Sequence, residues 1–191
     1  MMRRVLGLLA IVSVAFMIAC GSDDGDGGIT QEQRELRMGE NSGSNILFSG
    51  LASPLVLARN DVHSNVRDID LNNDGVDDVS IRAYEEFAGD KGLTFSTLND
   101  STRVSVVNNQ VKPLAEGDII TIDSESWGSA ESVVLAELIS GTPGGNWNGL
   151  GRRYIAIRMD IGIRRFLAWI EISVEEYDNY SFYNVALKSV P

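Results

Sequence analysis

The chain has 191 residues, a formal net charge of -11 and one cysteine. An acidic chain without clustered basic residues fits the phosphate backbone poorly, which excludes nucleic acid as an expected partner. A single cysteine also excludes an internal disulfide, so the stability of the exported domain must come from its hydrophobic core, assisted at most by a bound metal.

The N-terminus has the layout of an export signal. Two arginines follow the first two methionines, and residues 5–19 form an uncharged apolar run that is shorter than the roughly 20 residues of a membrane-spanning helix. The run ends at Ala19-Cys20, a junction that resembles the lipobox of bacterial lipoproteins. The resemblance implies that residues 1–19 are removed and that Cys20 is lipidated, with palmitate among its acyl groups. An ordinary secretory signal followed by an unrelated cysteine is the alternative.

Residues 20–44 are predicted to be the lipidated cysteine and a flexible acidic tether. The sequence GSDDGDGG after Cys20 combines glycines with mutually repelling aspartates. An acidic run at this place resembles the signal that sends some lipoproteins to the outer surface of the outer membrane, and a plain spacer is the alternative. Residues 29–40 are compatible with a short helix, but they have too few apolar residues for a buried stripe and are assigned to the tether.

Residues 45–191 are predicted to form one all-β domain, a single antiparallel β-sandwich. Short runs rich in β-branched and aromatic residues alternate with clusters of Gly, Asn, Asp and Pro, which is typical of sandwiches and barrels. The expected strands are residues 46–48, 55–58, 66–70, 79–84, 93–98, 103–107, 118–122, 133–138, 154–160, 166–174 and 182–188. The segment 129–139 is ambiguous between a short helix and a buried strand.

Side chains alternate most clearly in residues 166–175. Ala168, Ile170, Ile172 and Val174 share one face of a strand, and Trp169, Glu171, Ser173 and Glu175 share the other. This alternation predicts a half-buried antiparallel strand. The short link DIGIRR, residues 160–165, predicts that it forms a hairpin with residues 154–160.

The stretch DIDLNNDGVDDV, residues 68–79, is the main candidate for a metal site. From Asp70 it follows the pattern D-x-N-x-D-G-x-x-D, in which alternate oxygen-bearing side chains can surround one hard cation. The predicted ligands of a structural Ca²⁺ are Asp70, Asn72, Asp74, the backbone carbonyl of Val76, and Asp78. The pattern resembles the short calcium loops of dockerins and integrin-type extracellular repeats, and an acidic turn without metal is the alternative.

The loop departs from an EF-hand because its twelfth position is Ile81 instead of a bidentate glutamate. Residues 79–83 alternate as a strand, so a strand–loop–strand site is expected. The repulsion among the closely spaced aspartates is the physical reason to expect a cation there.

The order of features over residues 45–189 resembles a large group of poorly characterised secreted bacterial proteins. DLNNDGVDDVSI matches their aspartate loop, and YIAIRM (154–159) and AWIEI (168–172) match their C-terminal hairpin. The resemblance implies a single β-sandwich domain and brings no catalytic activity with it.

Two tryptophans are candidate ligand-binding residues. Trp127 and Trp147 lie in the polar segments SESWGSA and GGNWNGLG, where an indole can stack on a sugar ring. They make a glycan or a surface protein the candidate partner. The alternative is that both indoles fold back and cover the ends of the sandwich.

The catalytic alternative depends on Glu171 and Glu175. Their strand resembles the E-I-D-x-E strand of laminarinase-type glycoside hydrolases, although Ser173 replaces the central aspartate. The lone His63 has no serine nearby in a nucleophile elbow. We therefore expect a non-catalytic outer-membrane lipoprotein that binds a partner at the cell surface, with a polysaccharide hydrolase or a purely structural envelope protein as alternatives.

Overall fold

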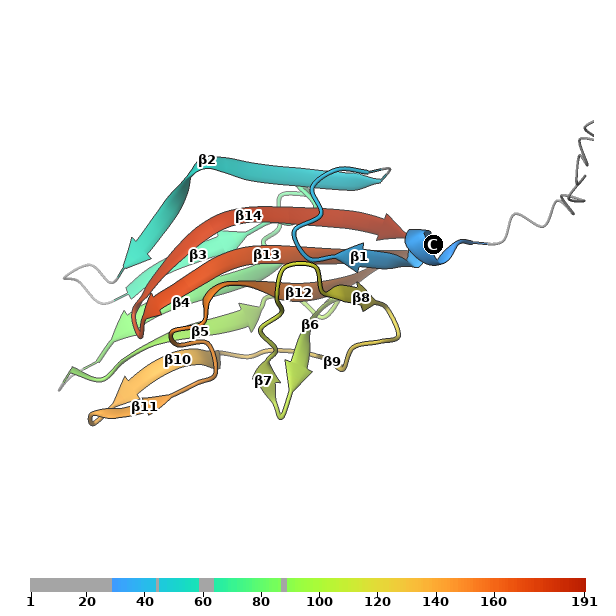
Figure 1. The fold of residues 1–191 in the computed structure, drawn as a ribbon. Coiled ribbons are helices and arrows are strands. Elements are labelled where there is room, and N and C mark those ends of the chain that lie inside the picture. Colours follow the sequence, from blue (N-terminus) through green and yellow to red (C-terminus); the bar gives the residue numbers. More distant parts are fainter. Residues whose placement is uncertain (1–28, 44, 59–63, 87–88) are drawn as a thin grey trace, which may run out of the picture.

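The computed structural model describes residues 29–43, 45–58, 64–86 and 89–191. Cys20, the apolar run 5–19 and His63 lie outside these residues. The described chain is almost entirely β-structure in antiparallel sheets, as Figure 1 shows. The predicted all-β sandwich is therefore confirmed.

Two large sheets form the sandwich (Figure 1). The five-stranded sheet has the order β11 (Thr142–Gly144), β10 (Val133–Ile139), β5 (Lys91–Thr97), β4 (Val79–Glu85), β3 (Ser64–Ile69). The seven-stranded sheet has the order β2 (Ile46–Ala58), β14 (Asn179–Val190), β13 (Arg164–Glu176), β12 (Gly151–Ile161), β6 (Thr102–Val107), β7 (Gln110–Val111), and β9 (Trp127–Gly128) pairs with β6. Every strand pair is antiparallel.

The main core lies between these two sheets. Ile81, Phe95 and Leu135 come from the five-stranded sheet, and Ile155 and Ile170 come from the seven-stranded sheet; all five are fully buried in one cluster. Burying such a side chain contributes about 1.5–3 kcal/mol. The ambiguous segment 129–139 supplies the strand β10 to this core, where the neighbouring residues Leu135 and Ala136 are both buried at a shift in the pairing with β5.

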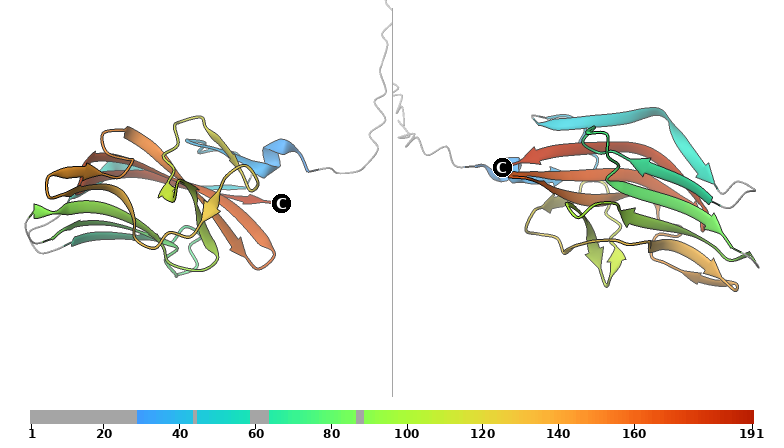
Figure 2. Two further views of the ribbon diagram at one scale, coloured as in Figure 1. Left: turned by 90° about the horizontal axis from the view of Figure 1, so that it is seen from below. Right: turned by 180° about the vertical axis from the view of Figure 1, so that it is seen from behind.

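A third, smaller layer covers part of the outer face of the seven-stranded sheet. The helix α1 (Gln31–Arg34) leads into β1 (Glu35–Arg37), which pairs with β8 (Ile119–Thr121). We call α1, β1 and β8 the cap. Leu36 and Ile120 of the cap are fully buried in a second cluster with Tyr154 and Trp169, and Figure 2 shows the cap lying against the long strands.

The cap corrects the expectation that residues 29–43 belong to the tether. The sequence shows no clear alternating pattern there because β1 has only three residues. Leu36 is the one buried side chain of β1, and Met38, just after the strand, is also buried. The Nζ of Lys188 on β14 donates to the carbonyls of Glu32 at 2.9 Å and Glu35 at 2.8 Å. It thereby fixes the end of α1 to the seven-stranded sheet.

The cap also explains why β13 is not the half-buried strand that its alternation predicts. Ala168 and Ile170 face the main core, whereas Trp169 on the opposite face is only 1% exposed because the cap covers it. Parallel strands that are buried on both faces usually have continuous apolar sequences. β13 is antiparallel and is also buried on both faces, but it carries Glu171 on the same face as Trp169.

The remaining strand predictions agree with the structure in place and differ in extent. Residues 46–48 and 55–58 belong to one long strand, β2. Its pairing with β14 shifts register at residues 51–54 of β2, a segment that contains Pro54. The predicted hairpin is confirmed, with residues 151–161 of β12 paired continuously to residues 164–174 of β13. The short strands β1, β7, β9 and β11 were not predicted, since two or three residues carry no periodicity.

Replacing Leu36 tests whether the cap is part of the folded domain. Leu36→Ala should lower the free energy of unfolding by about 2–5 kcal/mol, because it removes a fully buried side chain. Urea denaturation of a protein that begins at residue 29 measures the loss. Ile29→Ala, at an exposed position seven residues earlier, is the control and should change the free energy by about 0.5 kcal/mol or less. Equal, negligible effects of the two changes would show that residues 29–43 do not pack on the sandwich.

Candidate calcium loop

The acidic loop connects β3 to β4 at one end of the five-stranded sheet. The strands pair up to Ile69 and Val79, and the backbone N–H of Asp78 donates to the carbonyl of Ile69 at 2.9 Å. Asn73 and Gly75 have left-handed backbones, with φ of 58° and 89°, which Asn and Gly adopt most readily. The predicted strand–loop–strand geometry is therefore present.

Side chains of the predicted ligands organise the loop. Asp70 accepts hydrogen bonds from the N–H of Asp74 to Oδ1 at 3.2 Å and of Gly75 to Oδ2 at 2.8 Å. Asn72 Oδ1 accepts from the N–H of Asp74 at 2.8 Å, and Asp74 Oδ1 accepts from the N–H of Val76 at 2.9 Å. Each of these side chains accepts from a backbone N–H two to five residues later in the chain. These hydrogen bonds fold the loop around the side-chain oxygens.

Asp78 has a different role, at the buried base of the loop. Its side chain is 3% exposed, and its two carboxylate oxygens accept from Leu71 N–H at 2.9 Å and from Asn99 Nδ2 at 3.0 Å. Burial raises the pKa of Asp78, and the charges of Asp74 and Asp70 raise it further, while the two hydrogen bonds oppose this rise. The loop therefore concentrates negative charge that a bound cation would relieve.

The residues of the loop match calcium in type but are not gathered into a finished cage. Carboxylate, amide and carbonyl oxygens are the ligands that Ca²⁺ prefers. In the described ranges, however, no three side chains of His, Cys, Asp or Glu converge closely enough to hold a metal ion. Asn72 turns its Nδ2 toward Asp74 Oδ2 at 3.0 Å, so its amide would have to rotate before Oδ1 could join Asp74 on one ion.

Trp147 lies in the core, which corrects its assignment as a ligand-binding residue. Its side chain is fully buried, and Nε1 donates to the carbonyl of Val111 at 2.9 Å. The local cause is Gly145, with φ of 78°, where an added Cβ would lie 2.2 Å from the carbonyl oxygen of Leu135. Only glycine lets the chain pass this close to β10 and turn the following indole inward.

Trp127 is half-buried and also folds back onto the protein. Its Nε1 donates to the carbonyl of Ile122 at 2.7 Å, and its ring packs against the second cluster beneath the cap. The polar flanks of both tryptophans indicated exposed loops. The structure instead places Trp147 in the core between the sheets and Trp127 against the cluster beneath the cap, so both indoles fold back onto the protein.

Glu171 and Glu175 lie on β13 in unlike surroundings. Glu171 is 5% exposed; it accepts from Asn184 Nδ2, and from Arg152 at 3.4 Å. The guanidinium of Arg152 in turn stacks 4.0 Å above the ring of Tyr183. Glu175 is exposed and accepts from the hydroxyl of Ser181 at 3.2 Å. The polar cluster around Glu171 was not predicted, because its members come from three strands.

Tyr154 borders this cluster under the edge of the cap. Burial, followed by the charge of Glu171, raises the pKa of Tyr154 to about 12. Its ring meets Trp169 edge-on, with centroids 5.4 Å apart, and an added Cβ at Gly39 would lie 3.1 Å from its hydroxyl oxygen. Packing against Trp169 and the backbone at Gly39 therefore holds the ring of Tyr154 in place.

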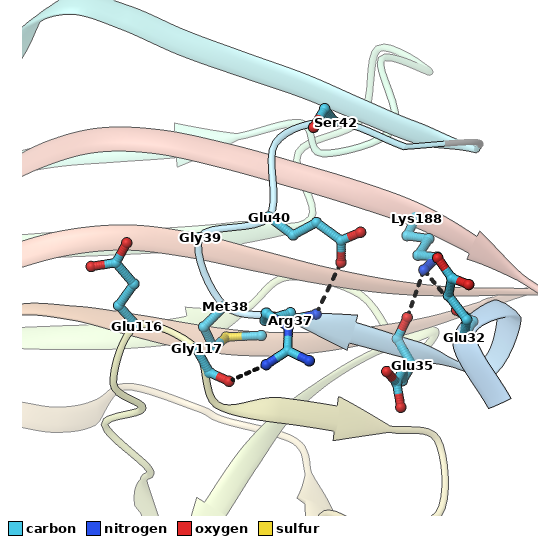
Figure 3. Close-up of a pocket in the computed structure, with 10 residues that line it drawn as sticks. All are labelled: Glu32, Glu35, Arg37, Met38, Gly39, Glu40, Ser42, Glu116, Gly117 and Lys188. Carbon is cyan, nitrogen blue, oxygen red and sulfur yellow. Dashed lines mark hydrogen bonds between the residues drawn. The ribbon is translucent and has the colours of Figure 1, made fainter.

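A hollow of about 670 Å³ opens between the cap and the turn before β8 (Figure 3). Four glutamates line it, at positions 32, 35, 40 and 116. Its two cations are held by backbone carbonyls: Arg37 donates to Gly117 at 3.1 Å, and Lys188 binds the end of α1 as described above. The hollow is thus acidic overall, and it was not predicted because its cap side was assigned to the tether.

Comparisons with known proteins found no relative. No family matches the sequence, and neither the curated proteins nor the solved structures contain a match. Among the described residues, no helix has the length and apolar character needed to cross a membrane.

A tryptophan replacement distinguishes a core indole from a binding indole. Trp147→Ala should lower the free energy of unfolding by about 3–5 kcal/mol, because the indole is fully buried. Asn148→Ala changes the exposed neighbour and should have little effect. Denaturant titration followed by far-UV circular dichroism measures both, and an unchanged midpoint for Trp147→Ala would place the indole outside the core.

Proposed function

We propose that the protein is a non-catalytic lipoprotein of the bacterial outer membrane, displayed at the cell surface, with a β-sandwich stabilised by calcium. The observation that supports calcium most strongly is the organisation of the β3–β4 loop. Asp70, Asn72 and Asp74 already hold the backbone of residues 74–76, so a bound ion would have to rearrange side chains such as the Asn72 amide more than the backbone.

The lipid anchor is supported by the sequence at Ala19-Cys20 and by the acidic run that follows it. The domain needs no disulfide, because its two apolar clusters supply the core of an exported protein. With both tryptophans folded back, partner binding is left to the exposed faces. A glycan or a surface protein remains the proposed partner class.

Calcium binding is tested by the thermal melt of the mature protein with excess calcium and with chelator. A ligand at 100 times its Kd that binds only the folded state adds about 2.7 kcal/mol. For a domain of this size the melting temperature should rise by roughly 5–10 °C. Absence of any shift at several millimolar calcium would reduce the loop to an acidic turn.

Two isosteric changes separate calcium coordination from general charge. Asp74→Asn removes a predicted ligand carboxylate while retaining an oxygen for the N–H of Val76, and it should abolish the calcium-dependent shift. Asp100→Asn removes the same charge from an exposed position outside the loop, and it should leave most of the shift. Equal losses in the two variants would indicate nonspecific charge screening.

The anchor is tested on the full chain in a Gram-negative host. The membrane-extracted protein should begin at Cys20 and carry the mass of a diacylglyceryl and an acyl group. Cys20→Ser should block lipidation and shift the protein out of the detergent-extracted membrane fraction. Recovery of wild-type protein with an unmodified Cys20 thiol would contradict the anchor.

One observation favours a second function, hydrolysis of a polysaccharide. Glu171 is a buried carboxylate beside Arg152 and Asn184, and it shares the face of β13 with Glu175. Release of reducing sugar from β-glucans by the wild type, and its loss in Glu171→Gln, would establish this alternative. No release from these substrates would remove it for β-glucans.

A further inference from the structure

The hairpin between β12 and β13 ends in a tight two-residue turn that exposes an apolar side chain. Ile161 pairs with Arg164, so the loop consists of Gly162 and Ile163 alone. Gly162 has φ of 60°, whereas Ile163 has no positive φ, which is the backbone of a type II′ turn. Ile163 is fully exposed, at 102%. The turn would accept any polar residue at this position, so the fold itself does not explain an isoleucine there.

The tip lies at the end of the molecule where the chain from Cys20 arrives. Arg165 pairs with Val190, and a hollow of about 500 Å³ beside them is lined by Ile29, Arg34, Arg165 and the C-terminal Pro191. Figures 1 and 2 show the C-terminus beside the first described residues. Ile29 follows Cys20 by nine residues, which span at most roughly 30 Å. The tip therefore remains close to any membrane that holds Cys20.

Three arginines gather around the tip, although the acidic β3–β4 loop lies at the same end of the molecule. Arg164 and Arg165 follow the exposed isoleucine, and Arg34 and Arg165 both line the hollow. Within the described residues, none of these three guanidinium groups has an ion-pair partner. Of the nearby acids, Asp160 is paired with Arg158 at 2.9 Å. Asp123 and Pro191, the residue that carries the C-terminal carboxylate, line the hollow with the arginines.

Other exposed apolar side chains lie at the same end. The backbone of Asp160, near the tip, donates to Ser101 at 2.9 Å, and that of Leu98 donates to Asp78 at 2.8 Å. The acidic loop and the hairpin tip are thus linked through residues 98–101. Leu98 is 48% exposed, and Val76 in the acidic loop is 60% exposed.

We infer that this anchor end, defined by Ile163, Arg164, Arg165 and Arg34, rests on the lipid bilayer. Ile163 enters the boundary between head groups and acyl chains, and the arginines meet lipid phosphates. The inference rests on the proposed lipid anchor at Cys20. It adds an orientation: the domain stands on the membrane with the β10–β11 hairpin pointing outward, instead of moving freely on its tether.

Site-directed labels on the full lipoprotein test this orientation. Cys20 is the only native cysteine and is blocked by lipid, so one added cysteine takes one environment-sensitive fluorophore. Ile163→Cys labels the tip, and Thr142→Cys labels the exposed β10–β11 hairpin at the other end. The proteins are reconstituted into vesicles of phosphatidylcholine and phosphatidylglycerol at 3:1, with or without brominated acyl chains.

The tip label should be quenched at least twofold more than the Thr142 label and should shift to shorter wavelength. Because that label replaces the isoleucine, Ile161→Cys repeats the measurement with Ile163 intact. Adding Ile163→Asp, or Arg164→Gln with Arg165→Gln, to the Ile161→Cys protein should reduce quenching toward the Thr142 level.

The outcomes distinguish the lipid anchor at Cys20 from the contact of the hairpin tip with the bilayer. The mass of the N-terminal peptide establishes lipidation first, and without lipid both proposals fall. A lipidated protein whose tip label is quenched no more than the Thr142 label would leave the anchor standing and overturn the docking. Strong quenching of both labels would also overturn it, because the domain would then have no fixed orientation.

Discussion

The architecture depends on burying β13 on both of its faces. One face supplies Ala168, Ile170 and Ile172 to the core between the two sheets, and the other supplies Trp169 to the cluster beneath the cap. A sheet with only one apolar face can be left open to water on the other side. Here Trp169 requires a cover, and the cap provides it with very few residues.

The same double burial explains the polar cluster around Glu171. A carboxylate on a covered face must keep hydrogen bonds or lose a large amount of free energy. Asn184 and Arg152 on the neighbouring strands provide these bonds, and Tyr183 stacks on the arginine. The cluster lies where the cap ends, so polar side chains begin where the apolar cover stops.

The sequence predicted most long strands, because their alternation and their turn residues lie within one continuous stretch. The fold class, the β12–β13 hairpin and the strand–loop–strand geometry around Asp70 all followed from such local patterns. The cap could not be predicted in this way, since Leu36 finds its cover on strands more than 80 residues away. Trp147 illustrates the same limit: its flanks are polar, yet the left-handed Gly145 turns the indole into the core.

The pairing of β2 with β14 sets the order in which the chain can fold. Among the strands that the structure describes, β2 has only one neighbour in its sheet, and that neighbour is β14, the last strand. Closing this pair requires a loop of more than 100 residues, and such distant contacts form late. The seven-stranded sheet therefore cannot close until nearly the whole chain is available, whatever the order in which its local hairpins form.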